Sequence, residues 1–126
     1  MNGIKLLVDS NIAIYFLLGY NDVQKYFFES QTGLSFISEL ELLSNPYFKE
    51  QEFESVRYLI SQHDVIAYQP ELKEIIINIR SKKKVKIPDA IIAATAIYLN
   101  VPLVSADKGF HGIDGLDLIL HDPASK

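Results

Sequence analysis

Four acidic residues stand where the sequence pattern predicts a strand to end or a helix to begin: Asp9, Glu41, Asp89 and Asp107. Asp9 directly follows an apolar run at residues 4–8, and Asp107 comes three residues after a second such run. Carboxylates that meet at one point repel each other unless positive charge lies between them. We therefore expect these four side chains to surround a divalent cation.

Mg²⁺ and Mn²⁺ take oxygen ligands, and water and substrate phosphates complete their coordination. We expect Asp9, Asp89 and Asp107 to be the metal ligands and Glu41 to complete a catalytic set of four. One ion or two in such a cluster can stabilise charge on the attacking and leaving oxygens of a phosphodiester displacement. Two polar residues near the aspartates, Asn11 and Ser105, are suited to orient a carboxylate or a bound water by hydrogen bonding.

Each acid also has a purely structural explanation, as a helix cap, a first-turn residue that matches the helix dipole, or a turn residue. All four acids fall where an α/β fold places a ligand site, and this favours one functional site over four separate structural roles. Glu39, two residues from Glu41, is an alternative fourth member. Two other functions stay open: an inactive binding module, and a phosphotransfer enzyme with Asp9 as its nucleophile. The second is disfavoured because Asn11 stands where phosphatases of that kind carry an acid.

Length and composition indicate one globular domain over residues 1–126. The chain has a net charge of −4 and is 48% hydrophobic, which is typical of a soluble folded protein. It has no cysteine, which excludes disulfides, thiolate catalysis and cysteine-based zinc sites. No signal peptide and no apolar stretch of about 20 residues is present, so we expect a cytoplasmic protein.

Short apolar runs alternate with helical patterns, which predicts an α/β fold with a parallel sheet. The expected strands are residues 4–8, 34–37, 65–68, 102–104 and 118–120. The expected helices are residues 11–18, 22–30, 38–44, 49–61, 70–80 and 88–99, the third opened by a capping box at Ser38 and Glu41. In such folds ligands bind beyond the carboxyl ends of the strands, where Asp9 and Asp107 are predicted to lie.

Four segments together carry a family resemblance. They are Leu6-Leu7-Val8-Asp9-Ser10-Asn11, Ile37-Ser38 through Glu41-Leu42-Leu43-Ser44, Pro88-Asp89-Ala90-Ile91-Ile92-Ala93-Ala94-Thr95-Ala96, and Leu103-Val104-Ser105-Ala106-Asp107-Lys108-Gly109-Phe110. In this order and at these separations the chain resembles the PIN-domain ribonucleases of the VapC toxin type, from Leu6 to about Leu120.

The resemblance implies a three-layer α/β/α sandwich with a central parallel sheet, an endoribonuclease activity dependent on Mg²⁺ or Mn²⁺, and a cognate protein antitoxin. It matches Asp9, Glu41, Asp89 and Asp107 to the acidic quartet of the family. Many relatives carry a further acid two residues after the last aspartate, and here that position is Gly109. The segment before Glu41 is also shorter than in many relatives.

Two further features bear on partners. Lys82, Lys83, Lys84 and Lys86 form a basic stretch just before Asp89, which indicates contacts to an RNA backbone or a solvated helix end. Six aromatic residues gather in and between the first two expected helices, and they suggest a homodimer or antitoxin surface: Tyr15, Phe16, Tyr20, Tyr26, Phe27 and Phe28. The three histidines have no ligand spacing and are expected at the surface.

Overall fold

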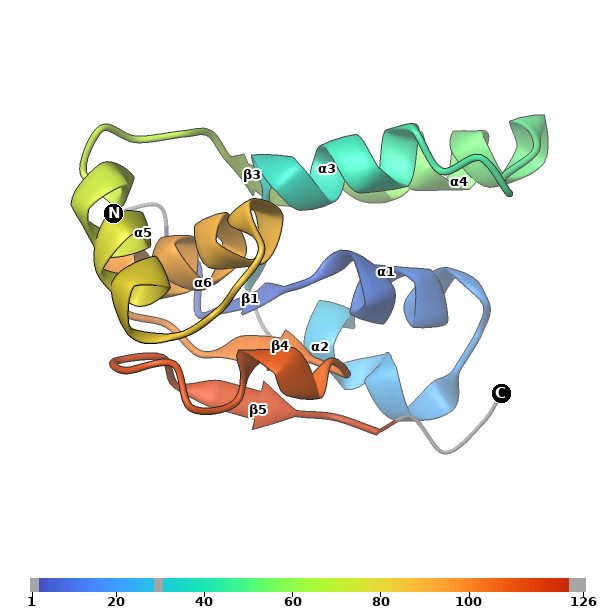
Figure 1. The fold of residues 1–126 in the computed structure, drawn as a ribbon. Coiled ribbons are helices and arrows are strands. Elements are labelled where there is room, and N and C mark those ends of the chain that lie inside the picture. The colour runs from blue at the N-terminus through green and yellow to red at the C-terminus, as the bar shows by residue number, and fades with distance from the viewer. Residues whose placement is uncertain (1–2, 29–30, 123–126) are drawn as a thin grey trace.

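A five-stranded parallel sheet forms the centre of the computed structural model, which describes residues 3–28 and 31–122 (Figure 1). Its strands are β1 (Leu6–Val8), β2 (Thr32–Ser35), β3 (Asp64–Ile66), β4 (Leu103–Ser105) and β5 (Leu118–Leu120). Their order across the sheet is β3-β2-β1-β4-β5, and every neighbouring pair is parallel. The expected α/β/α fold with a central parallel sheet is confirmed.

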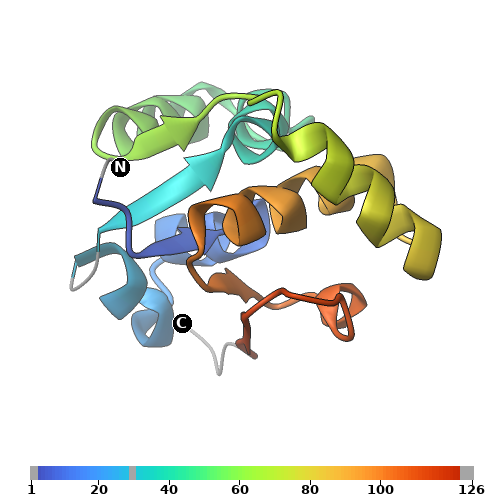
Figure 2. The same ribbon diagram turned by 90° about the vertical axis from the view of Figure 1, so that its left-hand side faces the viewer.

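Helices cover both faces of this sheet. They are α1 (Ser10–Leu17), α2 (Lys25–Phe28), α3 (Phe36–Leu43), α4 (Glu50–Ser61), α5 (Leu72–Lys82) and α6 (Ile87–Leu99), with short 3₁₀ helices at Asn21–Val23 (η1) and Lys108–Phe110 (η2). Figure 1 shows α5 and α6 on one side and α1 and α2 on the other, and Figure 2 shows α6 in front of the sheet with α1 behind it. Within the described ranges, no helix combines the length and the apolar character needed to span a membrane.

The alternation of side chains along β1 divides the core into two halves. Leu7 packs with apolar residues of α5 and α6, whereas Leu6 and Val8 pack with those of α1, α2 and α4. Successive side chains of a strand point to opposite faces, so a strand buried on both faces must be apolar throughout. The central strand β1 thus packs against both helical layers. Asp9 directly follows its last residue, Val8, at the carboxyl end of the sheet.

Helix α6 is apolar almost all round because it lies inside the molecule. Six of its residues from Ala90 to Ala96 are buried, and Pro88 in its first turn lacks the N–H that a helix start leaves unpaired. The helix ends at Asn100 in the left-handed conformation (φ 57°), and the backbone N–H of Asn100 donates to Ile97. This buried axis holds Asp89, in the first turn, in a fixed place.

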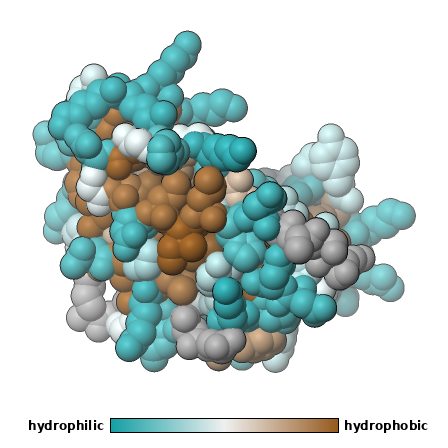
Figure 3. All heavy atoms as spheres, turned by 90° about the horizontal axis from the view of Figure 1, so that it is seen from below, coloured by the Kyte–Doolittle hydropathy of each residue, from teal (hydrophilic) through white to brown (hydrophobic). Residues whose placement is uncertain are grey.

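Strand β5 is an edge of the sheet and is only partly covered. Its backbone pairs with β4 alone, and Ile119 and Leu120 stay exposed among its side chains. Figure 3, which views the molecule from below with β5 on the near side, shows a broad apolar area there.

The predicted start of α3 is wrong. Residues 34–37 were expected to be a strand and Ser38 the cap, but β2 ends at Ser35, whose hydroxyl accepts a hydrogen bond from Ile37 N–H (3.1 Å) and caps the helix. The apolar run from Leu34 to Ile37 continues across this boundary, so hydrophobicity alone does not reveal it. Glu41 therefore lies in the second turn of α3 and closes no capping box.

Other boundaries differ more modestly. The helix expected at 22–30 is divided into η1 and α2, and its last two residues lie outside the described part of the chain. The helix expected from Pro70 begins at Leu72, and β3 is residues 64–66 instead of 65–68. His121 was expected at the surface, but its side chain is largely buried, and its Nδ1 lies 2.8 Å from the hydroxyl oxygen of Tyr26.

The left-handed residue that ends α6 predicts a specific stability difference. Asn100→Ala should lower the free energy of unfolding by about 1 kcal/mol, because a Cβ-bearing residue without a local polar partner is strained at positive φ. Asn100→Gly should leave it nearly unchanged, since glycine adopts this conformation freely. Urea denaturation of both variants measures the difference, and equal losses would contradict this explanation.

Candidate active site

All four predicted carboxylates line one cleft at the carboxyl end of the sheet. The cleft has a volume of about 420 Å³, and it is lined by Asp9, Ser10, Asn11, Glu41, Lys86, Pro88, Asp89, Ile92, Asp107 and Phe110. These residues come from four separate stretches of the chain: the β1–α1 junction, α3, the start of α6 and the segment after β4. The fold thus brings together acids that are up to 98 positions apart in the sequence.

Asp9 is the most constrained of the four. Its backbone N–H donates to the Val104 carbonyl (3.2 Å), which ties it to β4. One carboxylate oxygen, Oδ1, accepts from Ile12 N–H (3.1 Å) and caps α1, while Oδ2 accepts a short hydrogen bond from the Ser105 hydroxyl. The residue is only 4% exposed. The side chain of Asp9 therefore caps α1 and also lines the cleft.

Ser105 connects two of the carboxylates. Its hydroxyl donates to Asp9 and accepts from the backbone N–H of Asp107 (2.9 Å). Asp107 in turn caps η2, because its Oδ1 accepts from Gly109 N–H (2.7 Å). A Cβ on Gly109 would stand 3.0 Å from this same oxygen, so the glycine leaves room for the carboxylate. Asp107 thus stabilises the turn that follows β4 through its backbone N–H and its carboxylate.

Glu41 reaches the cleft from the second turn of α3. Its Oε1 accepts a hydrogen bond from the Ser10 hydroxyl (3.0 Å), and both residues line the cleft. Glu39, the alternative, is not among the lining residues. Asn11 lines the cleft as well, at the start of α1. Sequence reasoning missed Ser10, although its position directly after Asp9 was a usable signal.

Lys86 is a second residue that sequence reasoning placed incompletely. The sequence placed Lys86 in a basic stretch just before Asp89; in the structure it precedes α6 and lines the same cleft, where its charge favours the ionised form of Asp89. Burial and the neighbouring Asp107 outweigh this effect and raise the pKa of Asp89. Lys82, Lys83 and Lys84 do not line the cleft; they surround hollows beside it.

Burial and neighbouring carboxylates both disfavour the ionised form of Asp9. Burial is the main cause that raises the pKa of Asp9 to about 6, and the carboxylates of Asp107 and Glu41 raise it further. Hydrogen bonds from Ser105 and Ile12 act in the opposite direction without cancelling the shift.

The donor set fits a hard cation in kind, since carboxylates and hydroxyls supply only oxygen. In residues 3–28 and 31–122, no three Asp, Glu, His or Cys side chains lie close enough together to form a ready ligand set. Mg²⁺ often binds through one or two carboxylates, with waters and substrate phosphates in its other positions. The cleft therefore suits an ion held partly through water and substrate.

Comparison with known proteins identifies the family. The family model described as PIN domain matches residues 6–116, so the chain belongs to the PIN domain family, a family of nucleases. The resemblance noted from the sequence is thereby confirmed. A comparison with curated protein sequences finds no significant match.

Several solved structures of similar fold are chains of toxin–antitoxin or VapBC complexes. A chain in a toxin–antitoxin complex from Klebsiella pneumoniae is 26% identical, with a TM-score of 0.79 over 97% of this chain and 100% of the other. A chain of promoter-bound VapBC2 from Rickettsia felis is 22% identical (TM-score 0.79; 94% and 100% covered). A chain of DNA-bound VapBC from Salmonella typhimurium is 20% identical (TM-score 0.82; 92% and 97% covered). The last two chains are less than 25% identical to this one, so their similarity shows the fold alone.

The raised pKa of Asp9 predicts how stability depends on pH. Its folded-state pKa of about 6 lies above the unfolded value of 3.8, so stability from this group is fully present below pH 3.8 and is lost as pH rises through 6. In chelator, Asp9→Asn should raise the free energy of unfolding at pH 7.5 by about 2–3 kcal/mol, since each pKa unit is worth about 1.4 kcal/mol. The gain should shrink towards pH 4.

Thermal or urea unfolding at several pH values measures this effect. Asp117→Asn is the matched control, because Asp117 is an exposed aspartate outside the cleft and should show no such gain. An Asp9→Asn variant less stable than the parent at pH 7.5 would contradict the assignment of an electrostatic penalty to Asp9.

Proposed function

We propose that this chain is a metal-dependent endoribonuclease that hydrolyses RNA phosphodiester bonds, and that it is the toxin of a type II toxin–antitoxin pair. The observation that carries the proposal is the convergence of Asp9, Glu41, Asp89 and Asp107 on one cleft in which burial and neighbouring carboxylates disfavour the ionised form of Asp9. Membership of a nuclease family supports the reaction class. The proposal treats residues 1–126 as a single nuclease domain acting in the cytoplasm.

The residues have distinct roles in this proposal. Asp9, Asp89 and Asp107 would hold Mg²⁺ or Mn²⁺, with Glu41 completing the set and Asn11 orienting bound water. When bound, the ion supplies charge stabilisation for the phosphate under attack and promotes ionisation of the attacking water. Ser105 fixes the Asp9 carboxylate and the turn of Asp107 through its two hydrogen bonds. Ser10 orients Glu41.

Removing one charge from the set should stop catalysis without unfolding the protein. We expect Asp9→Asn and Asp89→Asn to lower Mg²⁺-dependent cleavage of a mixed RNA pool more than about 100-fold, since even residues that only support a metal ligand cost 10–100-fold. Circular dichroism should show an intact fold, because asparagine retains the size and the acceptor oxygen of aspartate. Asp117→Asn serves as the control with normal activity.

Three outcomes would contradict the proposal. Retained Mg²⁺-dependent cleavage in both purified variants would remove the carboxylates from the mechanism. No cleavage by the parent with Mg²⁺ or Mn²⁺, on any RNA in the pool, would favour a catalytically silent binding module. A phosphoryl group trapped on Asp9 would favour a phosphotransfer enzyme instead.

The hydroxyl of Ser105 gives a graded test of the same site. Ser105→Ala leaves an oxygen of Asp9 and the N–H of Asp107 without their partner, so we expect a 10–100-fold loss of activity. Ser105→Thr keeps the hydroxyl and should retain more activity than alanine. Titration of activity with Mn²⁺ separates the two roles, because a positioning defect should raise the Mn²⁺ concentration needed for half activity.

A protein antitoxin is part of the proposal. The similar structures are chains of toxin–antitoxin or VapBC complexes, and an apolar groove of about 640 Å³ lies between α1, α2 and α4. Phe16, Phe27 and Phe28 of the predicted aromatic cluster line it, and Phe28 is 73% exposed. This groove is the candidate antitoxin surface.

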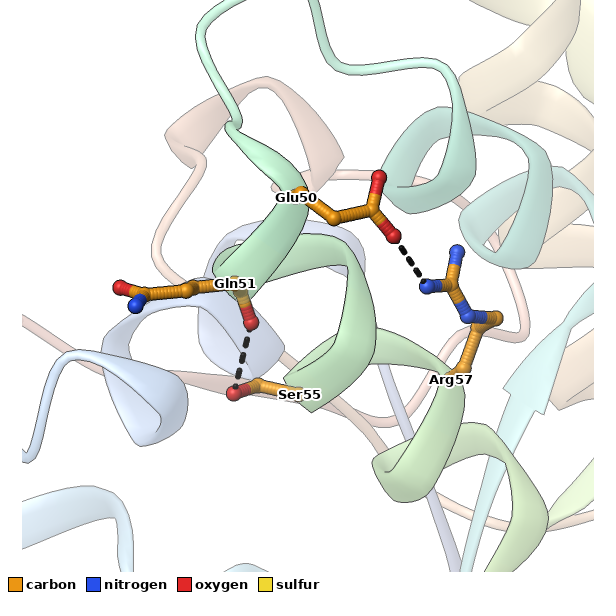
Figure 4. A network of polar contacts seen from close by, with 4 residues as sticks. All are labelled: Glu50, Gln51, Ser55 and Arg57. Atoms are coloured by element: carbon orange, nitrogen blue, oxygen red, sulfur yellow. Dashed lines mark hydrogen bonds and ion pairs between the residues drawn. The ribbon is translucent and has the colours of Figure 1, made fainter.

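Helix α4 gives the groove a polar wall. Figure 4 shows the Ser55 hydroxyl donating to the Gln51 carbonyl (3.3 Å) and Arg57 paired with Glu50 (2.8 Å) along this helix. Gln51 and Ser55 line the groove, whereas Glu50 and Arg57 do not. A partner that fits must therefore be apolar on one face and polar at its margin. A homodimer is also proposed; the aromatic cluster is one candidate for its contact surface, and Leu40 and Leu43, exposed on one face of α3, are another.

A further inference from the structure

The loop between α5 and α6 concentrates positive charge on a chain that is negative overall. Five of the twelve lysine and arginine residues fall within residues 80–86, although the net charge of the chain is −4. Residues 80–85 line a hollow of about 350 Å³. Four of these lining residues are basic: Arg80, Lys82, Lys83 and Lys84. We call residues 80–86 the basic loop.

The basic loop is built into the fold. Arg80 turns back so that its Nε donates to the Val85 carbonyl (2.9 Å), and the N–H of Lys83 closes α5 by donating to Ile79 (3.0 Å). Val85 is 8% exposed and packs in the core beside α5 and α6. Both ends of the loop are thus anchored, so its lysines project from a fixed backbone.

The loop adjoins the cleft on two sides. Lys86 lines the cleft itself with Asp89. Lys82 and Lys83 also line a second hollow of about 230 Å³ with residues 112–114, which come shortly after Phe110, another lining residue of the cleft. The basic loop therefore borders the cleft at Lys86, and its Lys82 and Lys83 lie beside the segment that follows Phe110.

Most of this charge is available to a ligand. Lys82 lies 3.5 Å from the Asp114 carboxylate, an exposed ion pair that contributes little to stability. Across residues 3–28 and 31–122, no ion pair involves Lys83, Lys84 or Lys86. Lysines act as point charges for phosphate, and contacts of this kind give affinity and orientation without reading base sequence.

We propose that the basic loop is a binding site for the backbone phosphates of single-stranded RNA that flank the bond to be cut. Lys86 contacts the phosphate nearest the carboxylates, and Lys83 and Lys84 contact phosphates further along the strand. The carboxylates line a cleft, which a single strand enters more readily than a duplex does. This inference rests on the proposed ribonuclease function and adds to it the path and the strandedness of the substrate.

The test is the salt dependence of RNA binding to the full chain in chelator, where cleavage is blocked, measured by fluorescence anisotropy with a labelled single-stranded RNA. Lys83→Gln with Lys84→Gln should weaken binding several-fold and reduce the slope of log K against log salt by about 1.4, since each phosphate contact on a single strand contributes about 0.7. The arginine pair, K83R with K84R, should restore the slope.

The matched control is Lys5→Gln with Lys73→Gln, which removes the same charge elsewhere. Lys73 stands ten residues before Lys83 at the start of α5, about 15 Å away along the helix axis. Lys5 immediately precedes β1, at the opposite edge of the sheet from the cleft. This control should leave the slope nearly unchanged and so separates a local site from the effect of net charge.

A third variant, Lys86→Gln, should lower kcat as well as affinity, because Lys86 shares the cleft with the carboxylates. Equal slopes for the basic-loop variant and its control would overturn the inference, as would equal competition by duplex RNA or by an acidic peptide. Failure of the parent to cleave RNA with Mg²⁺ or Mn²⁺ would instead overturn the proposed function, whatever the binding slopes show.

Discussion

The candidate active site depends on carboxylates that the fold brings to one cleft, although their like charges repel each other. Asp9 lies almost fully out of water beside Asp107 and Glu41, and burial with this repulsion raises its pKa to about 6. Ionising Asp9 in this arrangement costs stability, because desolvation and like charges both disfavour the ionised form. A cost concentrated at one cleft is characteristic of a functional site, where a bound cation or substrate offsets it.

The topology of the sheet explains where this cleft forms. In the order β3-β2-β1-β4-β5, the chain first extends the sheet to one side of β1 and then returns to extend it on the other. In open parallel sheets the crevice for a ligand lies outside the strand ends at this reversal. Here the reversal falls between β1 and β4, and the residues that follow these two strands carry Asp9 and Asp107.

Much of this arrangement was predictable from the sequence because it depends on local features. An apolar run that ends in Asp9, and another that ends shortly before Asp107, reveal strand ends directly, and Pro88 marks the start of α6. The start of α3 was not predictable from hydrophobicity, because the apolar run from Leu34 to Ile37 spans the end of a strand and the start of a helix.

Contacts between side chains that are distant in the sequence could not be predicted either. Nothing in the order of residues shows that Ser10 donates to Glu41, that Lys86 turns into the cleft, or that Arg80 folds back on the Val85 carbonyl. These depend on rotamers and on the angle between packed helices. The choice between Glu39 and Glu41 is of the same kind, since residues two apart on a helix point in different directions and only the packing of α3 decides which one meets the cleft.

The hydroxyl of Ser105 has one proton, and that proton is committed to Asp9, while its oxygen holds the backbone N–H that begins the η2 turn. The link is therefore directional: it suits Asp9 as an acceptor, and it ties the orientation of that carboxylate to the placement of the turn. Phe110, at the end of the same turn, is buried against the far side of the sheet from α1. The hydrogen bonds of Ser105 thus join the Asp9 carboxylate to a turn whose last residue packs in the half of the core that contains α5 and α6.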